Sequence, residues 1–163
     1  MINTIYLDMD GVIANFDKKY HSIFGVNCRD DINKSNWDTF IFDHKGFEVL
    51  ELMPDAEQLL NFLFKTNKNI CILSCAGKLK TYHDVVKQKT QWLSRNGLGL
   101  LPHLFTYTKA DKSKYATSSS LLIDDSIQCI EPFIQAGGLG ILHTNTANTI
   151  KLFEEQFTAC AQS

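Results

Sequence analysis

The chain has 163 residues, of which 44% are hydrophobic and 21% are charged, and its formal net charge is −2. This length fits a single domain whose hydrophobic core is large enough to be stable without disulfide bonds or structural metal ions. The composition excludes a disordered chain. The near-neutral charge argues against a protein that binds polymeric nucleic acid through a broad positive surface, but it leaves the binding of one nucleotide open.

Few sequence features report on the cellular compartment. No apolar run approaches the ~18 residues of a membrane span. The first residues lack a basic segment and already carry an acid at Asp8, so they do not resemble a signal peptide. The five cysteines contain no C-x-x-C pair, and we interpret them as the free thiols of a cytoplasmic protein.

Short apolar runs alternate with helical patterns from the start of the chain. Residues 2–7 predict a strand, and apolar side chains at helical spacing follow it as far as Gly25. Residues 26–53 have weak periodicity but are rich in aromatic side chains. Residues 56–63 carry apolar side chains at positions i, i+3, i+4 and i+7, which predicts an amphipathic helix.

The second half of the chain continues this alternation. A strand is predicted at 70–73 and a helix at 82–93, with Gly97 placed to end that helix. The remaining predicted elements are strands at 104–107, 121–123 and 139–142 and a closing helix that contains Ile150, Phe153 and Phe157. Strands alternating with helices predict an α/β fold with a parallel sheet covered on both faces.

Polar residues that can act in catalysis end several of these strands: Asp8, Ser74 and Asp124. Ligands of parallel α/β sheets bind at the carboxyl ends of the strands. At the first strand end, Asp8 and Asp10 leave the strand at i and i+2, and Gly11 allows a tight turn. One carboxylate could attack as a nucleophile while the other transfers a proton. The alternative is a solvated acidic turn.

A second acidic pair, Asp124 and Asp125, follows another predicted strand. Acids from both strand ends would repel one another if they were buried together, and a divalent cation would relieve that repulsion. Carboxylate oxygens suit Mg²⁺. The alternative for the second pair is a helix N-terminus, where acidic residues favour the helix dipole.

A phosphate ligand would also need hydrogen-bond donors and positive charge. The Ser74 hydroxyl and the backbone N–H groups beside it could hold a phosphate oxygen, although a capping serine is an equal alternative. Lys114 precedes the second acidic pair and could balance carboxylate and phosphate charge. Lys112 and Lys109 are close rivals, and spacing alone does not choose among the three.

The chemistry-bearing residues occur in the order Asp8-Met9-Asp10-Gly11-Val12, Ser74, Lys114 and Leu122-Ile123-Asp124-Asp125. Together they resemble the motifs of the haloacid-dehalogenase-like (HAD) phosphatases over about residues 1–145. The resemblance implies one HAD-like domain over 1–163, with a Rossmannoid parallel sheet flanked by helices. It also implies a core at about 1–14 and 70–163 and a small helical cap, inserted after the first strand, at about 15–69.

A narrower resemblance, to the 5′(3′)-deoxyribonucleotidases, is carried by residues 6–16, 50–56 and 121–126. In that family the lysine stands ten residues before the acidic pair, a spacing that selects Lys114 here. A phosphate-contacting lysine four residues after the hydroxyl of the second motif maps onto Lys78.

The resemblance implies a phosphate transfer in two steps. Asp8 would form an aspartyl-phosphate, and Asp10 would protonate the leaving oxygen and then activate water. Mg²⁺ would bind the Asp8 carboxylate, the Asp10 backbone carbonyl and the side chain of Asp124 or Asp125. The residues implied to hold the phosphoryl oxygens are Ser74, Lys114 and Lys78.

Aromatic side chains are concentrated in the range expected for the cap, where they could stack on a nucleobase. We single out Phe16, Trp37 and Phe47 as base contacts. The sequence therefore favours a Mg²⁺-dependent phosphatase of (deoxy)ribonucleoside monophosphates, a small-molecule enzyme without a polymeric nucleic-acid or membrane partner. Another small phosphate ester as substrate, or a catalytically silent phosphate-binding module, are the alternatives, and a homodimer is compatible with these residues.

Overall fold

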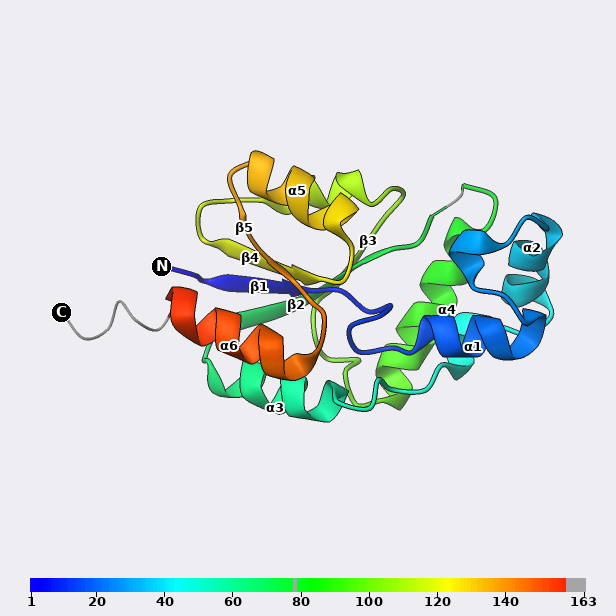
Figure 1. The fold of residues 1–163 in the computed structure, drawn as a ribbon, viewed down its shortest axis with the longest axis horizontal. Coiled ribbons are helices and arrows are strands. Elements are labelled where there is room, and N and C mark those ends of the chain that lie inside the picture. Colours follow the sequence, from blue (N-terminus) through cyan, green and yellow to red (C-terminus); the bar gives the residue numbers. More distant parts are fainter. Residues whose placement is uncertain (78, 158–163) are drawn as a thin grey trace.

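The computed structural model describes residues 1–77 and 79–157. Its strands form one parallel sheet in the order β3-β2-β1-β4-β5 (Figure 1). The strands are β1 (Thr4–Leu7), β2 (Asn69–Cys75), β3 (His103–Thr106), β4 (Ser120–Asp124) and β5 (Leu139–Leu142). This sheet confirms the predicted α/β fold.

The centre of the sheet is β1, which pairs in parallel with both β2 and β4. Leu7, the last residue of β1, stands beside Ile72 on one side and Ile123 on the other. All residues of β4 are buried, as are most of β2, because a parallel sheet with helices on both faces leaves no strand face in water. The residues that follow these three strands therefore emerge next to one another.

Helices cover both faces of the sheet (Figure 1). One face carries α3 (Ala56–Lys65) and α6 (Thr146–Phe157), and the other carries α5 (Ile127–Gln135) and the 3₁₀ helix η3 (Ala110–Tyr115). The apolar stripe predicted over 56–63 is buried, and the Phe62 and Phe153 rings join α3 to α6 with their centroids 5.4 Å apart.

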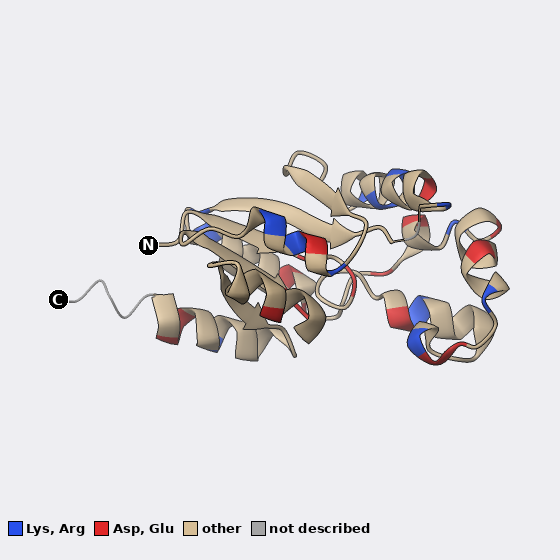
Figure 2. Cartoon of the chain, turned by 90° about the horizontal axis from the view of Figure 1, so that it is seen from above, with Lys and Arg blue, Asp and Glu red and all other residues tan. Residues whose placement is uncertain are grey.

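The remaining helices form a separate group beyond the carboxyl ends of the strands, which we call the helical lobe (Figures 1 and 2). It consists of α1 (Phe16–Phe24), η1 (Cys28–Asp30), α2 (Ser35–Phe42), η2 (Gly46–Val49) and α4 (Tyr82–Arg95). No helix of the described residues is long and apolar enough to cross a lipid bilayer.

Helix α4 follows β2 but packs on the lobe rather than on the sheet. Gln88 Nε2 donates a hydrogen bond to the Ile41 carbonyl (2.8 Å), and Trp92 Nε1 donates one to the Leu50 carbonyl (2.9 Å). The range 15–69 expected for the cap is thus divided: its first part forms most of the lobe, whereas α3 lies on the sheet. The apolar pattern of a helix marks the side that is buried but not the element that buries it.

Candidate active site

A cleft of about 580 Å³ lies between the carboxyl ends of the strands and the helical lobe. Its sheet side is lined by acids from β1 and β4, and its lobe side is lined by aromatic rings. The lining residues that matter below are Asp8, Asp10, Asp124, Phe16, Trp37 and Phe47. The structure thus brings together both acidic pairs and the aromatic residues singled out from the sequence.

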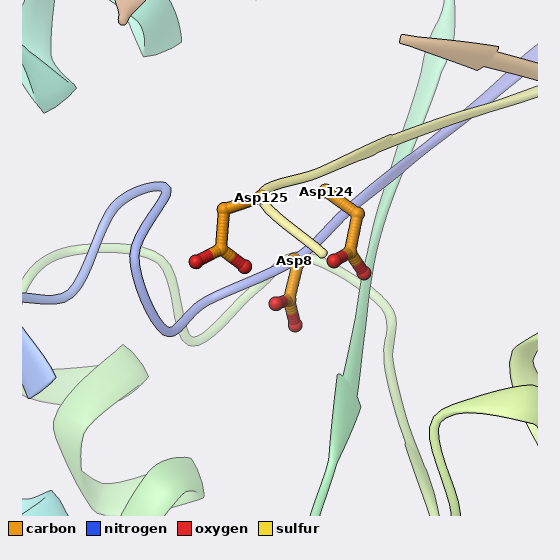
Figure 3. Close-up of side chains that lie close together, drawn as sticks. All are labelled: Asp8, Asp124 and Asp125. Atoms are coloured by element: carbon orange, nitrogen blue, oxygen red, sulfur yellow. The ribbon is translucent and has the colours of Figure 1, made fainter. Parts of the chain in front are cut away.

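The acids at the strand ends converge. Asp8, Asp124 and Asp125 each have a carboxylate oxygen within 4.8 Å of the others, and Figure 3 shows their side chains pointing into one space. Gly11 makes this approach possible, because it has a positive φ of 79° and a Cβ there would lie 2.3 Å from Asp125 Oδ2. A side chain at this position would push Asp125 out of the cluster.

The lysine beside these acids is Lys112, not the expected Lys114. Lys112 Nζ lies 2.8 Å from Asp8 Oδ1 and 2.6 Å from Asp124 Oδ2, with its side chain 1% exposed. The Lys114 side chain is 72% exposed and pairs with Asp111 at 2.7 Å. Both lysines lie in η3, and in a 3₁₀ helix residues two apart point in different directions, so only one of them faces the acids.

Burial lowers the pKa of Lys112, but the charges of Asp8 and Asp124 outweigh burial and raise the pKa above its ordinary value. Lys112 is therefore a permanent cation at the centre of the acidic cluster. The third candidate, Lys109, also lines the cleft, and its ammonium donates to Ser126 Oγ at 3.1 Å.

A second buried lysine, Lys89 of α4, was not anticipated from the sequence. Its side chain is 0% exposed, and its ammonium donates hydrogen bonds to Asp10 Oδ2 (2.6 Å), Ser74 Oγ (2.8 Å) and the Cys75 carbonyl (2.9 Å). The sequence feature that could have indicated its burial is its position: Lys89 stands four residues after Val85, on the buried face of an amphipathic helix. A lysine on such a face needs a buried anion.

The acids differ in how burial and neighbouring charges act on their pKa values. Burial raises the pKa of Asp10; Lys89 opposes this rise and Asp8 adds to it. Burial and then the charge of Asp8 raise the pKa of Asp124. For Asp125, burial followed by the charges of Asp8 and Asp124 raises the pKa to about 7. An acid of raised pKa can carry a proton near neutral pH.

The residues after β2 form another part of the cleft wall. Cys75, Ala76 and Gly77 line the cleft, whereas Ser74, expected to contact phosphate, is fully buried and is not among the lining residues. Its hydroxyl oxygen accepts the bond from Lys89, so the hydroxyl hydrogen is directed elsewhere. Lys78, the other expected phosphate contact, lies outside the described residues.

The acidic cluster has the chemistry of a magnesium site. All of its ligand atoms are oxygens, which Mg²⁺ prefers. Within the described residues, buried Asp8 Oδ1 and Asp10 Oδ1 have no aligned hydrogen-bond donor, although Lys112 Nζ approaches the former to 2.8 Å. These oxygens therefore keep lone pairs for a ligand, and the residues fit a divalent cation held by Asp8, Asp124 and Asp125.

The aromatic wall of the cleft is formed by Phe16, Trp37 and Phe47. The Phe16 and Phe47 rings stack with centroids 5.4 Å apart and planes at 12°, and the Trp37 ring meets Phe47 edge to face at 5.9 Å. Phe47 is only 2% exposed, whereas Phe16 and Trp37 are half-buried. The latter two rings therefore present more surface to a ligand.

Solved structures with a similar architecture include several hydrolases. A hydrolase from Streptococcus pneumoniae has a TM-score of 0.56 at 12% identity, with 94% of this chain and 98% of that chain covered. A HAD-superfamily hydrolase from Ehrlichia chaffeensis has a TM-score of 0.55 at 13% identity, with 95% and 98% covered. The D,D-heptose 1,7-bisphosphate phosphatase from Burkholderia thailandensis has a TM-score of 0.51 at 9% identity, with 83% and 74% covered.

No protein-family model and no curated protein sequence matches the chain. At these low identities, the likeness to solved structures concerns the arrangement of the elements and not the substrate. The sheet order, the acids at the ends of β1 and β4 and the structural neighbours agree on one conclusion: the chain has the fold of the HAD-superfamily hydrolases.

Proposed function

We propose that the protein is a Mg²⁺-dependent phosphatase that hydrolyses nucleoside monophosphates through an aspartyl-phosphate on Asp8. The observation that carries this proposal is the cleft itself, in which Asp8, Asp10 and Lys112 face an aromatic wall. A carboxylate nucleophile, a second carboxyl for proton transfer and a fixed cation are the groups that phosphoryl transfer requires.

In the first step, an Asp8 carboxylate oxygen attacks phosphorus and the bond from phosphorus to the ester oxygen breaks. Asp10 gives its proton to that leaving oxygen and becomes a carboxylate. In the second step, water attacks the phosphorus of the aspartyl-phosphate, and Asp10 takes the proton from this water. The Asp8 carboxylate and inorganic phosphate are released, and both acids return to their starting states.

The charge on the phosphoryl oxygens must be balanced throughout. Lys112 holds the Asp8 carboxylate in place and supplies one positive charge next to it. Ser74 is fully buried and does not line the cleft, so it supports Lys89 rather than the phosphoryl group. By its sequence position, Lys78 would add a second cation. When bound by Asp8, Asp124 and Asp125, Mg²⁺ would supply further positive charge at the phosphoryl group.

The aromatic wall supports a nucleoside as the rest of the substrate. The cleft of about 580 Å³ lies within the range of small-molecule sites. Phe16 and Trp37 offer partly exposed ring surface beside the acids, and a base stacked on an aromatic ring gains ~1–3 kcal/mol. In a 5′(3′)-deoxyribonucleotidase activity, Phe16 and Trp37 would stack on the base of the bound nucleotide.

The decisive experiment measures phosphate release from nucleoside 5′- and 3′-monophosphates and from small sugar phosphates, with and without Mg²⁺. We expect Mg²⁺-dependent release, fastest with nucleotides. Release from sugar phosphates alone would leave a phosphatase of another small ester. No release from any ester, together with binding of inorganic phosphate, would identify a silent phosphate-binding module instead.

A further inference from the structure

We propose that Lys89 is a positioning residue that acts through Asp10: it fixes the carboxyl group that transfers the proton and ties it to the helical lobe. This inference rests on the proposed phosphatase function but adds to it a residue outside the resembled motifs. Lys89 lies in α4, and its side chain crosses from the lobe to the strand ends.

Three hydrogen bonds fix the Lys89 ammonium in one position. An ammonium has three N–H groups, and here they reach Asp10 Oδ2, Ser74 Oγ and the Cys75 carbonyl. The acceptors come from the β1 loop and from the end of β2. Since every donor is used and the side chain is fully buried, Lys89 can hold Asp10 in one orientation relative to Ser74.

The choice of oxygen on Asp10 follows from these bonds. Lys89 occupies Oδ2 at 2.6 Å, whereas Oδ1 is buried without a hydrogen-bond partner among the described residues. Oδ1 is therefore the oxygen that carries the proton to the leaving group and later receives one from water. Lys89 keeps its own proton in both steps and balances the charge that Asp10 acquires.

Two buried lysines divide the acids between them. Lys112 pairs with Asp8 and Asp124, and among the described residues the acid paired with Lys89 is Asp10. The group that attacks phosphorus and the group that moves the proton thus have separate cations. Loss of Lys89 should disturb proton transfer while leaving the nucleophile paired.

The same helix also holds the aromatic wall. Gln88 Oε1 accepts a hydrogen bond from the Phe47 backbone N–H at 3.2 Å, and the Lys89 ammonium lies 4.7 Å from the centre of the Phe47 ring, within the range of a cation–π contact. Consecutive residues of α4 therefore hold the wall and the proton-transfer group, so the two sides of the cleft are held in a fixed relation.

The test compares two phosphate esters in a Lys89→Met variant. A nucleoside monophosphate has an alkoxide leaving group that needs a proton, whereas p-nitrophenolate leaves without one. We expect kcat/KM to fall by about 10²-fold or more for the nucleotide and by less than about tenfold for p-nitrophenyl phosphate. Lys87→Met, at an exposed site on the same helix, should leave both values unchanged.

A double variant tests the pairing without reference to activity. Lys89→Met leaves the partly buried Asp10 carboxylate without its cation, so it should lower the urea midpoint of unfolding, and Asp10→Asn in the same chain should restore part of the loss. If Lys89→Met alone does not fold, the double variant should still fold. An unrestored midpoint in the double variant would overturn the inference.

The two proposals fail in different ways. Equal losses of kcat/KM on both esters, with active wild-type protein, would overturn the positioning role and leave the phosphatase intact. Wild-type protein that hydrolyses neither ester would overturn the proposed function and this inference with it.

Discussion

The two sides of the cleft are built by different means. On the sheet side, Asp8 follows β1 directly and Asp124 is the last residue of β4, so the pairing of Leu7 with Ile123 in these adjacent parallel strands places the two acids together. On the lobe side, Phe16, Trp37 and Phe47 come from separate short helices. Trp37 donates a hydrogen bond to Thr81, the residue before α4, and the Phe47 backbone N–H donates one to Gln88 of α4. Substitutions on the sheet side should therefore abolish chemistry, whereas substitutions on the lobe side should change which substrate is accepted.

The largest effect is expected from Asp8→Asn, because the amide is a poor nucleophile. Phosphate release should fall by at least about 10⁴-fold, on the scale seen when a catalytic nucleophile is removed. The measurement is steady-state phosphate release at saturating Mg²⁺. Activity within about tenfold of the wild type would remove Asp8 from the nucleophile's role.

The next largest effect is a loss of stability that should differ between substitutions of the two lysines of η3. Lys112→Met leaves Asp8 and Asp124 without their shared cation, and breaking such a buried pair costs about 3–5 kcal/mol of unfolding free energy. Lys114→Met is the matched control, since its side chain pairs with Asp111 at the surface and surface pairs contribute little. Urea unfolding of both variants, without Mg²⁺, is the measurement. A larger loss in Lys114→Met would contradict the placement of Lys112.

These two lysines show where prediction from the sequence stopped. The strand ends were predictable because an apolar run followed by an acid fixes both the strand and the position of the carboxylate. A lysine in a short 3₁₀ helix carries no such pattern, because residues two apart point in different directions and the sequence does not show which direction faces the acids. The spacing taken from the family that the sequence resembles selected Lys114, whereas the structure places Lys112 at the acids.

The lobe was predictable only in part, for a related reason. The helical pattern over 82–93 identified α4, but α4 packs on α2 and η2 rather than on the sheet. Its Gln88 and Trp92 side chains donate hydrogen bonds to the carbonyls of Ile41, in α2, and Leu50, just after η2. The burial of Lys89 was not predictable from residue type, because a lysine within an amphipathic helix is usually solvated. Only its place on the buried face, one helical turn from Val85, distinguished it.

On the lobe side, Trp37→Ala should alter substrate choice rather than chemistry. Loss of one stacking ring costs ~1–3 kcal/mol for a bound base, so kcat/KM for a nucleoside monophosphate should fall by about 5- to 150-fold. A small sugar phosphate, which has no base, should be hydrolysed with little change. Phe64→Ala, at an exposed ring of α3 away from the cleft, is the control. Equal losses on both substrates would show that Trp37 supports the site as a whole.

The smallest effect is the pH dependence of Mg²⁺ binding on the sheet side. The pKa of Asp125 is raised to about 7, against roughly 3.9 for a free aspartate. Between these values the native carboxyl holds a proton that the unfolded chain has lost. In the metal-free protein, Asp125 therefore makes its full contribution to the free energy of unfolding below pH ~4, and this contribution is lost as the pH rises to ~7.

Magnesium should reverse this trend, because Mg²⁺ binds the carboxylate and must displace the Asp125 proton at low pH. The increase in Tm produced by Mg²⁺ should therefore be larger at about pH 8 than at about pH 5.5. Asp125→Asn should make the Mg²⁺-induced increase in Tm nearly the same at the two pH values. Asp43→Asn, at an exposed site of the lobe, should leave the pH dependence of this increase unchanged. An equal Mg²⁺ effect at both pH values in the wild-type protein would mean that Asp125 is not a ligand. The cation would then be held by the other acids, whose strand-end positions bring them together without it.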